Sequence, residues 1–152
     1  MSSSEERKLI LKSSDNEEFV VKESSAVQCL TIKNLVEDRC VSDPIPLANV
    51  DSKILALVIE FMEKHAETTL SNSEKKEFDV EFVKKPFDDL LELILAANYL
   101  DFRELMDVLC NTCAKQMENW SVEEVREKFN IQNDYTVEEE KAARAENPWA
   151  FE

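Results

Sequence analysis

The residues with the clearest capacity for chemistry are two cysteines, Cys110 and Cys113, which are separated by two residues. Cys-x-x-Cys is the spacing of thioredoxin-like redox sites and of half a zinc site. No second pair has that spacing, because Cys29 and Cys40 stand alone. The pair falls within a predicted helix, where both thiols share roughly one face and cysteine behaves as a small hydrophobic residue. We interpret the pair as structural and reduced, with a small thiol enzyme as the alternative.

The single histidine, His65, and the many carboxylates form no recognisable catalytic group. His65 falls near the end of a predicted helix, where a positive charge complements the helix dipole. General-base catalysis would need a nucleophile and an orienting acid, and the sequence pattern supplies neither. The acidic runs Glu123–Glu124 and Glu138–Glu140 fall in first turns of predicted helices, where negative charge is stabilising. We therefore predict no catalytic residue, no metal site and no cofactor, and we expect that the protein is not an enzyme.

Glycine is absent from the 152-residue chain. Walker and dinucleotide loops, EF-hands and nucleophile elbows all need glycine, so these sites are excluded. The net charge of −15 argues against binding nucleic acid or an anionic membrane surface. No apolar run is long enough to span a bilayer, and the N-terminus lacks the apolar stretch of a secretory signal. We expect a soluble intracellular protein.

The N-terminal part of the chain has the pattern of a small α/β domain. Lys8–Lys12 and Glu18–Lys22 predict two strands joined by a turn in which Asn16 can take the left-handed conformation. A helix with one apolar side is predicted over Thr31–Arg39. The prolines within Pro44–Leu47 exclude a helix and favour an edge strand.

A long amphipathic helix is predicted next, capped by Asp51 or Ser52. An exposed loop is predicted over residues 66–76, because that stretch is polar and aperiodic. Pro86 begins another helix, and Phe87–Leu100 is apolar nearly all round, which predicts a central, buried helix. The inward residues of the amphipathic helix are predicted to be Ile54, Leu55, Leu57, Val58, Phe61 and Met62.

The C-terminal part predicts short helices with thin apolar seams. Asp101 is predicted to cap one helix, and Ser121 and Thr136 begin two others through capping boxes with Glu three residues later. Trp149 and Phe151 then place large aromatic side chains near a chain end, which is normally polar. We expect this tail to dock, either on its own protein or on a partner.

Four segments of the chain resemble one known family. They are Ile10–Asp15, Ile45–Val50, Ile94–Leu100 and Phe129–Thr136, the last of which reads Phe-Asn-Ile-Gln-Asn-Asp-Tyr-Thr. These segments are similar to members of the S-phase kinase-associated protein 1 family and its plant paralogues, the small adaptors of cullin–F-box ubiquitin ligases. The similarity of the last segment continues to Glu152, through Glu138–Glu140 and Asn147-Pro148-Trp149. The resemblance covers nearly the whole chain in order.

The resemblance implies an α+β, mostly helical fold: a BTB/POZ-like α/β domain followed by a C-terminal helical extension. Residues 1–65 would form the N-terminal part of the BTB/POZ-like domain, and residues 66–76 the exposed variable loop. Residues 77–100 would supply the remaining helices of that domain. Residues 101–152 would form the helical dimerisation and F-box-binding extension.

The resemblance further implies a non-catalytic adaptor subunit of an SCF ubiquitin ligase in the nucleus and cytoplasm. Its partners would be F-box proteins and a cullin scaffold, with the RING subunit reached indirectly. Phe78, Trp120 and Pro148 depart from the residues usual in the family, which indicates a divergent paralogue. The alternatives are a BTB/POZ-like protein that self-associates or binds a different partner, and a non-functional paralogue.

The same resemblance assigns candidate contacts to residues of this chain. Asn98 and Tyr99 match the pair that faces the cullin in the family. The F-box-binding surface would come from the region Ile94 to Glu152. Within that region the candidate contacts are Val108, Phe129, Asn130, Ile131, Asn133 and Trp149.

Overall fold

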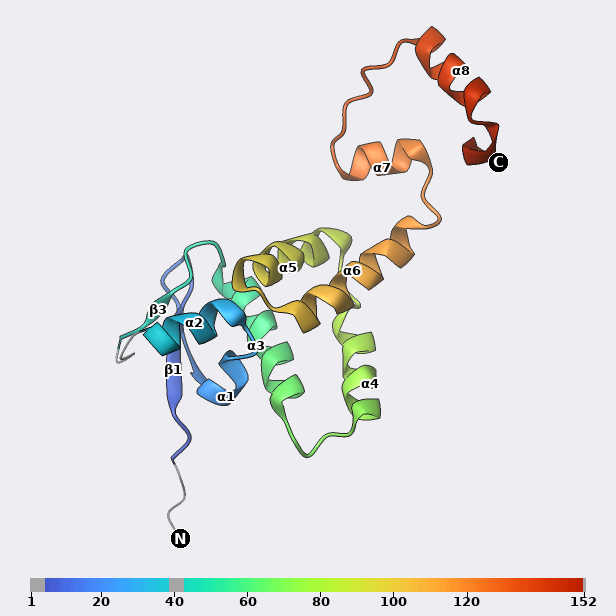
Figure 1. The fold of residues 1–152 in the computed structure, drawn as a ribbon. Helices are drawn as coiled ribbons and strands as arrows, with labels where there is room; N and C mark the ends of the chain where they lie inside the picture. Colours follow the sequence, from blue (N-terminus) through green and yellow to red (C-terminus); the bar gives the residue numbers. More distant parts are fainter. Residues whose placement is uncertain (1–4, 39–42, 152) are drawn as a thin grey trace. The chain divides into compact units, whose positions relative to one another are not determined.

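The computed structural model describes residues 5–38 and 43–151 (Figure 1). The predicted helix end at Arg39, the cysteine Cys40 and the end of the predicted F-box-binding region at Glu152 lie outside these residues. The chain divides into two compact units, Met1–Ala114 and Lys115–Glu152. The elements that begin in the first unit are β1 (Lys8–Lys12), β2 (Glu18–Lys22), α1 (Glu23–Ala26), α2 (Leu30–Asp38), β3 (Ile45–Pro46), α3 (Ser52–Ala66), α4 (Asn72–Phe82), α5 (Phe87–Leu100) and α6 (Arg103–Met117).

The sheet of the first unit has three strands in the order β2-β1-β3. Strand β2 pairs antiparallel with β1, with Leu9 opposite Val21, and β3 pairs parallel with β1, with Leu11 opposite Ile45. All four of these side chains are buried. Asn16 takes a left-handed conformation with φ of 68° in the β1–β2 turn. The two predicted strands, the turn and the edge position of the proline-containing segment are confirmed.

The β1–β2 turn is attached to the beginning of α3 through Asp15. Its carboxylate accepts a hydrogen bond from Ser13 Oγ at 2.6 Å, and further ones from Ser52 N at 2.8 Å and Ser52 Oγ at 2.5 Å. Ser13 is buried, and its Oγ accepts from Glu17 N at 3.0 Å. Hydrogen bonds to the ionised form, first from Ser13 and then from Ser52, lower the pKa of Asp15 to about 2.

Helix α3 forms the centre of the first unit. Asp51 caps it by accepting a hydrogen bond from Ile54 N at 2.9 Å, as predicted. The ring of Phe61 lies 5.4 Å from the Phe82 ring and 5.5 Å from the Phe102 ring, so α3 packs against residues from two other parts of the chain. Of the predicted inward residues, Leu57 is half-buried, and those that are buried are Ile54, Leu55, Val58, Phe61 and Met62.

Helix α5 packs against α3 with only one of its faces. The prediction that this helix is buried all round is wrong, because Leu95 is 70% exposed and Leu91 and Ile94 are only half-buried. A helix that packs with one side buries mainly positions three and four apart, whatever the composition of its exposed face. The buried residues of α5 are Phe87, Leu90, Leu93, Ala96, Ala97 and Leu100.

The predicted loop over residues 66–76 is wrong from Asn72 onward, where α4 begins. Ser71 and Glu74 form a capping box, with Glu74 N donating to Ser71 Oγ at 3.2 Å and Ser71 N donating to Glu74 Oε2 at 2.7 Å. The first three residues of α4 are exposed, which explains why apolar periodicity did not predict this helix.

The prediction that Asp101 caps the start of α6 is wrong. This residue ends α5 in a left-handed conformation with φ of 50°, and its N–H donates to Asn98 O at 3.2 Å. Phe102, Leu105 and Leu109 are buried, so most of α6 packs in the first unit. Packing thus divides the chain after Ala114, whereas the functional division at residue 101 stays a prediction.

The second unit continues with α7 (Val122–Lys128), α8 (Val137–Glu146) and the 3-10 helix η1 (Pro148–Phe151). Both predicted capping boxes are confirmed, at Ser121 with Glu124 and at Thr136 with Glu139. None of the residues described between 115 and 151 is buried. The whole described chain is therefore a mostly helical α+β protein, as predicted, with its core in the first unit.

We predict that the attachment made by Asp15 weakens in acid. Its folded-state pKa lies below the ordinary value of 3.8, so the contribution is present above about pH 4 and is lost as pH falls toward about 2. Urea unfolding followed by circular dichroism should show Asp15→Asn to be less stable than the parent at pH 6, with the difference shrinking between pH 4 and 2. Asp107→Asn, which removes an exposed carboxylate of α6, should show no such pH-dependent difference.

Candidate functional site

The cysteines do not have the geometry of a redox pair. Cys113 is buried, Cys110 is exposed, and neither forms a disulfide. Burial raises the pKa of Cys113, and it raises the pKa of Cys29 to about 12. A redox pair needs an accessible thiol with a lowered pKa, so these environments argue against the thiol-enzyme alternative.

The described residues also offer no metal centre. Within residues 5–38 and 43–151, no three or more histidine, cysteine or carboxylate side chains are placed so that they could hold a metal ion. None of the helices in the same part of the chain is long and apolar enough to cross a membrane. The candidate functional residues are therefore those exposed on the surfaces of the two units.

The first candidate surface lies at the end of α5. Asn98 is exposed and Tyr99 is half-buried, so the structure places both predicted cullin contacts on the last turn of the helix. Leu95 lies one turn earlier and is 70% exposed. We call Leu95, Asn98 and Tyr99 the α5 group. Sequence reasoning missed Leu95 because an apolar helix was expected to bury all its large side chains.

Helix α2 holds the backbone of the α5 group in place. Thr31 Oγ1 donates a hydrogen bond to Tyr99 O at 3.1 Å, and Leu30 N donates to Asp101 O at 3.3 Å. The neighbouring Leu100 is fully buried. The α5 group therefore presents an apolar and a polar side chain from a rigid position, which suits a preformed protein-binding surface.

The second candidate surface comes from the second unit. Phe129 ends α7 as its C-cap, with its ring centre 6.4 Å from that of Trp120. Asn130 takes a left-handed conformation with φ of 52°, and Ile131 N donates to Arg126 O at 2.8 Å. This turn leaves Ile131 52% exposed.

The remaining predicted F-box contacts are distributed over both units. Asn133 Oδ1 accepts a hydrogen bond from Tyr135 N at 3.2 Å, and Trp149 in η1 is 76% exposed. Val108 is half-buried and belongs to the first unit. We call the predicted contacts of the second unit the C-terminal group: Phe129, Asn130, Ile131, Asn133 and Trp149.

Arg144 connects the elements of the second unit. Its Nη2 lies 3.4 Å from Glu140 Oε1 and 3.8 Å from Glu123 Oε1, and its guanidinium lies 4.7 Å from the centre of the Phe151 ring. Arg144 thus links α7, α8 and η1. Only the Glu140 contact could have been predicted from sequence, through its spacing of four residues on one helix.

Other exposed apolar residues of the second unit were not among the sequence predictions. Tyr135 is 58% exposed and Val137 is 79% exposed. Acidic residues outnumber basic ones in this unit, and exposed carboxylates occupy the first turns of α7 and α8. The arrangement suits a partner that offers apolar side chains together with basic ones at their rim.

Comparison with known proteins relates both units to one family. Residues 7–67 match the sequence model of the Skp1 family tetramerisation domain, which is of the POZ type, and residues 103–150 match that of the Skp1 family dimerisation domain. The chain is 46% identical to SKP1-like protein 1A of Arabidopsis thaliana, with 96% of this chain and 98% of the relative aligned. It is 42% identical to SKP1-like protein 1 of Oryza sativa subsp. japonica, over 100% of both chains.

These matches confirm the predicted family and the BTB/POZ-like character of the N-terminal part. They also show that the chain extends over nearly the full length of these two relatives. The roles assigned above to individual residues of the α5 group and the C-terminal group stay predictions.

We predict that the cysteines differ strongly in reactivity. Exposed Cys110 should be alkylated before Cys29 and Cys113 in the folded protein, because burial protects Cys113 and raises its pKa, and Cys29 is buried as well. Brief treatment with iodoacetamide followed by peptide mass mapping measures the order, with urea-unfolded protein as the control. Fast modification of Cys113, or a reversible disulfide between it and Cys110, would restore the thiol-enzyme alternative.

Proposed function

This chain belongs to the Skp1 family, and on that premise we propose that it is the adaptor subunit of a cullin–RING–F-box (SCF) ubiquitin ligase. One surface binds the cullin scaffold and another binds the F-box protein, which brings a substrate for ubiquitination and proteasomal degradation. The adaptor acts by position, because holding two reactants in one complex raises their effective concentration while other subunits supply the chemistry.

The observation that carries the proposal is the exposure of large apolar side chains in the second unit, whose described residues include none that is buried. Ile131, Val137 and Trp149 are more than half exposed, and no residue described between 115 and 151 is buried. Exposed apolar groups of this kind mark protein-binding surfaces. In the proposal, F-box proteins cover the C-terminal group.

The α5 group supports a second, separate contact. It lies in the first unit on a helix whose opposite face is buried, so a partner can bind it without any rearrangement of the core. We assign Asn98 and Tyr99 to the cullin, with Leu95 as an additional apolar contact. The proposed location in the nucleus and cytoplasm follows from the adaptor role alone.

A second candidate function is self-association through the sheet. Strand β2 is an edge strand, and Val20 on it is 62% exposed. An open edge with an exposed β-branched residue can pair with another strand. In that case the protein would form a concentration-dependent dimer without affinity for F-box domains.

Co-expression with several F-box domains tests the adaptor proposal directly. We expect a 1:1 complex in size-exclusion chromatography with light scattering. Expression of the chain alone over a range of concentrations is the control, since a homodimer at high concentration would favour self-association. If none of the F-box domains tested binds, the result would favour a specialised or non-functional paralogue.

Substitutions should separate the two surfaces. We expect Trp149→Ala to weaken F-box binding at least tenfold and to leave cullin binding nearly unchanged, because a buried aromatic anchor contributes about 2 kcal/mol or more. The double variant Asn98→Lys with Tyr99→Lys should have the reverse effect. Calorimetric titration of each variant with each partner measures both effects, and equal losses in all four titrations would contradict the assignment of surfaces.

A further inference from the structure

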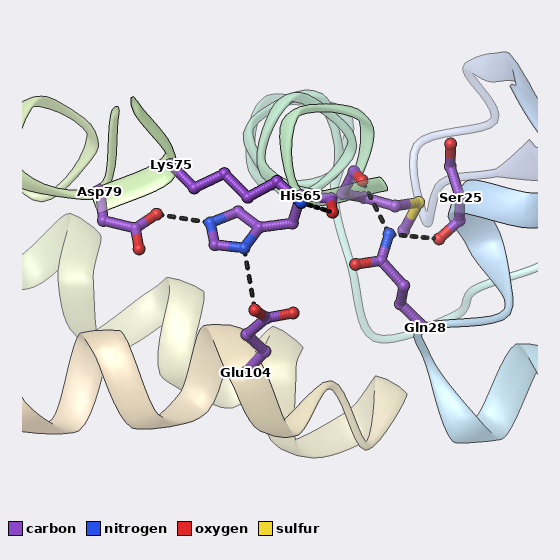
Figure 2. A network of polar contacts seen from close by, with 7 residues as sticks. Ser25, Gln28, His65, Lys75, Asp79 and Glu104 are labelled. Atoms are coloured by element: carbon purple, nitrogen blue, oxygen red, sulfur yellow. Dashed lines mark hydrogen bonds and ion pairs between the residues drawn. The ribbon is translucent and has the colours of Figure 1, made fainter. Parts of the chain in front are cut away.

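The only histidine of the chain bridges three helices (Figure 2). His65 lies in the last turn of α3, and its side chain is 5% exposed. Its Nε2 lies 2.6 Å from Asp79 Oδ1 of α4, and its Nδ1 lies 2.9 Å from Glu104 Oε1 of α6. The sequence predicted only a favourable position at a helix end. The structure adds two carboxylate partners that are distant in the sequence.

The two bonds form together only when the ring carries two protons. A carboxylate accepts hydrogen bonds, and a neutral imidazole has a single N–H to donate. The imidazolium donates from both nitrogens, and each bond is then strengthened by opposite charges. The observed geometry therefore fits the doubly protonated ring.

Aromatic rings enclose the imidazole on its other sides. The Phe61 ring stacks on it with 4.1 Å between ring centres, and the Phe78 ring meets it edge-on at 6.4 Å. Asp79 is 18% exposed at its side chain and Glu104 is 57% exposed. Water therefore reaches the Nδ1–Glu104 bond more easily than the Nε2–Asp79 bond.

Helix α4 is attached to α3 through this histidine and through the packing of Phe78 and Phe82 on Phe61. Phe82 is the buried residue of α4, and most of the helix is exposed. Lys75 Nζ donates to the backbone oxygen of His65 at 3.0 Å, so α4 binds the same residue at two points. Helix α6, in contrast, is fixed by its buried residues Leu105 and Leu109.

A groove between these helices is lined by His65 and by further charged side chains. Helix α4 contributes Lys75 and Lys76 beside Asp79, and α6 contributes Asp107 beside Glu104. On the remaining side of α3 lies the uncharged Gln28, whose Nε2 donates to Met62 O at 2.7 Å (Figure 2). The predicted F-box contact Val108 lines the same groove, one turn after Glu104.

We propose that His65 is a proton-dependent lock that holds α4 to α6. With two protons on the ring, the hydrogen bonds to Asp79 and Glu104 are both formed. When pH rises, the Nδ1 proton leaves to water, the Nδ1 lone pair then faces the Glu104 carboxylate, and that bond opens. Helix α4 remains bound to α3 through Asp79 and Phe82. Its Asp79 bond is nevertheless weakened, because the ring no longer carries the opposite charge, and its link through the ring to α6 is lost. The groove beside Val108 also loses one positive charge.

The lock is tested on the full chain by combining two NMR measurements. Ring nitrogen shifts of His65 follow its protonation with pH. Protection factors of the α4 backbone amides, referred to the unfolded chain at each pH, follow the attachment of the helix. We expect α4 protection to fall about twofold to fivefold with the same midpoint as the ring titration. The effect is modest because solvent screens the exposed Glu104.

Two matched substitutions on α6 decide whether the bridge is the cause. The amide of Glu104→Gln can accept from Nδ1–H or donate to its lone pair, so the bond to α6 should persist and α4 protection should depend on the ring titration less than in the parent. Asp107→Asn removes the same charge from the same groove and should keep that dependence. A ring with one proton at every pH, or identical behaviour of the two variants, would overturn the proposal. Neither measurement requires an F-box protein, so the lock and the adaptor function can fail independently.

Discussion

In the described part of the chain, Cys113 is the last residue with a buried apolar side chain. The difference between the two units follows from where this burial ends. The first unit has a continuous core around α3, which fixes α5 and most of α6. The second unit relies on capping boxes and on the ion pairs of Arg144, contacts that contribute about 1 kcal/mol or less each. Short helices held in this way gain most of their stability by burying apolar side chains against something else. A protein with this division has one part that specifies the fold and another that favours a partner.

Local signals explain why much of the fold was predictable. The β1–β2 hairpin follows from two apolar segments around a turn, and Asn16 takes the left-handed conformation expected of an asparagine there. Apolar periodicity and a cap at Asp51 predicted α3, and capping boxes at Ser121 and Thr136 predicted α7 and α8. In each case the deciding interactions lie within a few residues of one another in the sequence.

The errors arose where tertiary packing or a competing local signal decided the outcome. The capping box at Ser71 extended α4 into a stretch that had been predicted as a loop, because an exposed helix needs no apolar periodicity. Asp101 is the left-handed C-cap of α5, a position that glycine usually takes and for which this chain has no glycine. The partners of His65 come from α4 and α6, and no spacing in the sequence indicates that they meet. Exposure of Leu95 likewise depends on which face of α5 meets α3.

Family resemblance predicted both candidate surfaces, but they differ in how much of the chain a partner must order when it binds. Thr31 already holds the backbone at Tyr99, so a partner at the α5 group meets a preorganised surface and loses little affinity to conformational entropy. A partner at the C-terminal group must also stabilise helices that have no fully buried residue, and part of its interaction free energy is used for that ordering. Large aromatic contacts such as Trp149 suit that role, because each buries much apolar surface while few rotatable bonds are fixed. Affinity at the C-terminal group should therefore vary more among partners than affinity at the α5 group, which suits the proposed adaptor role.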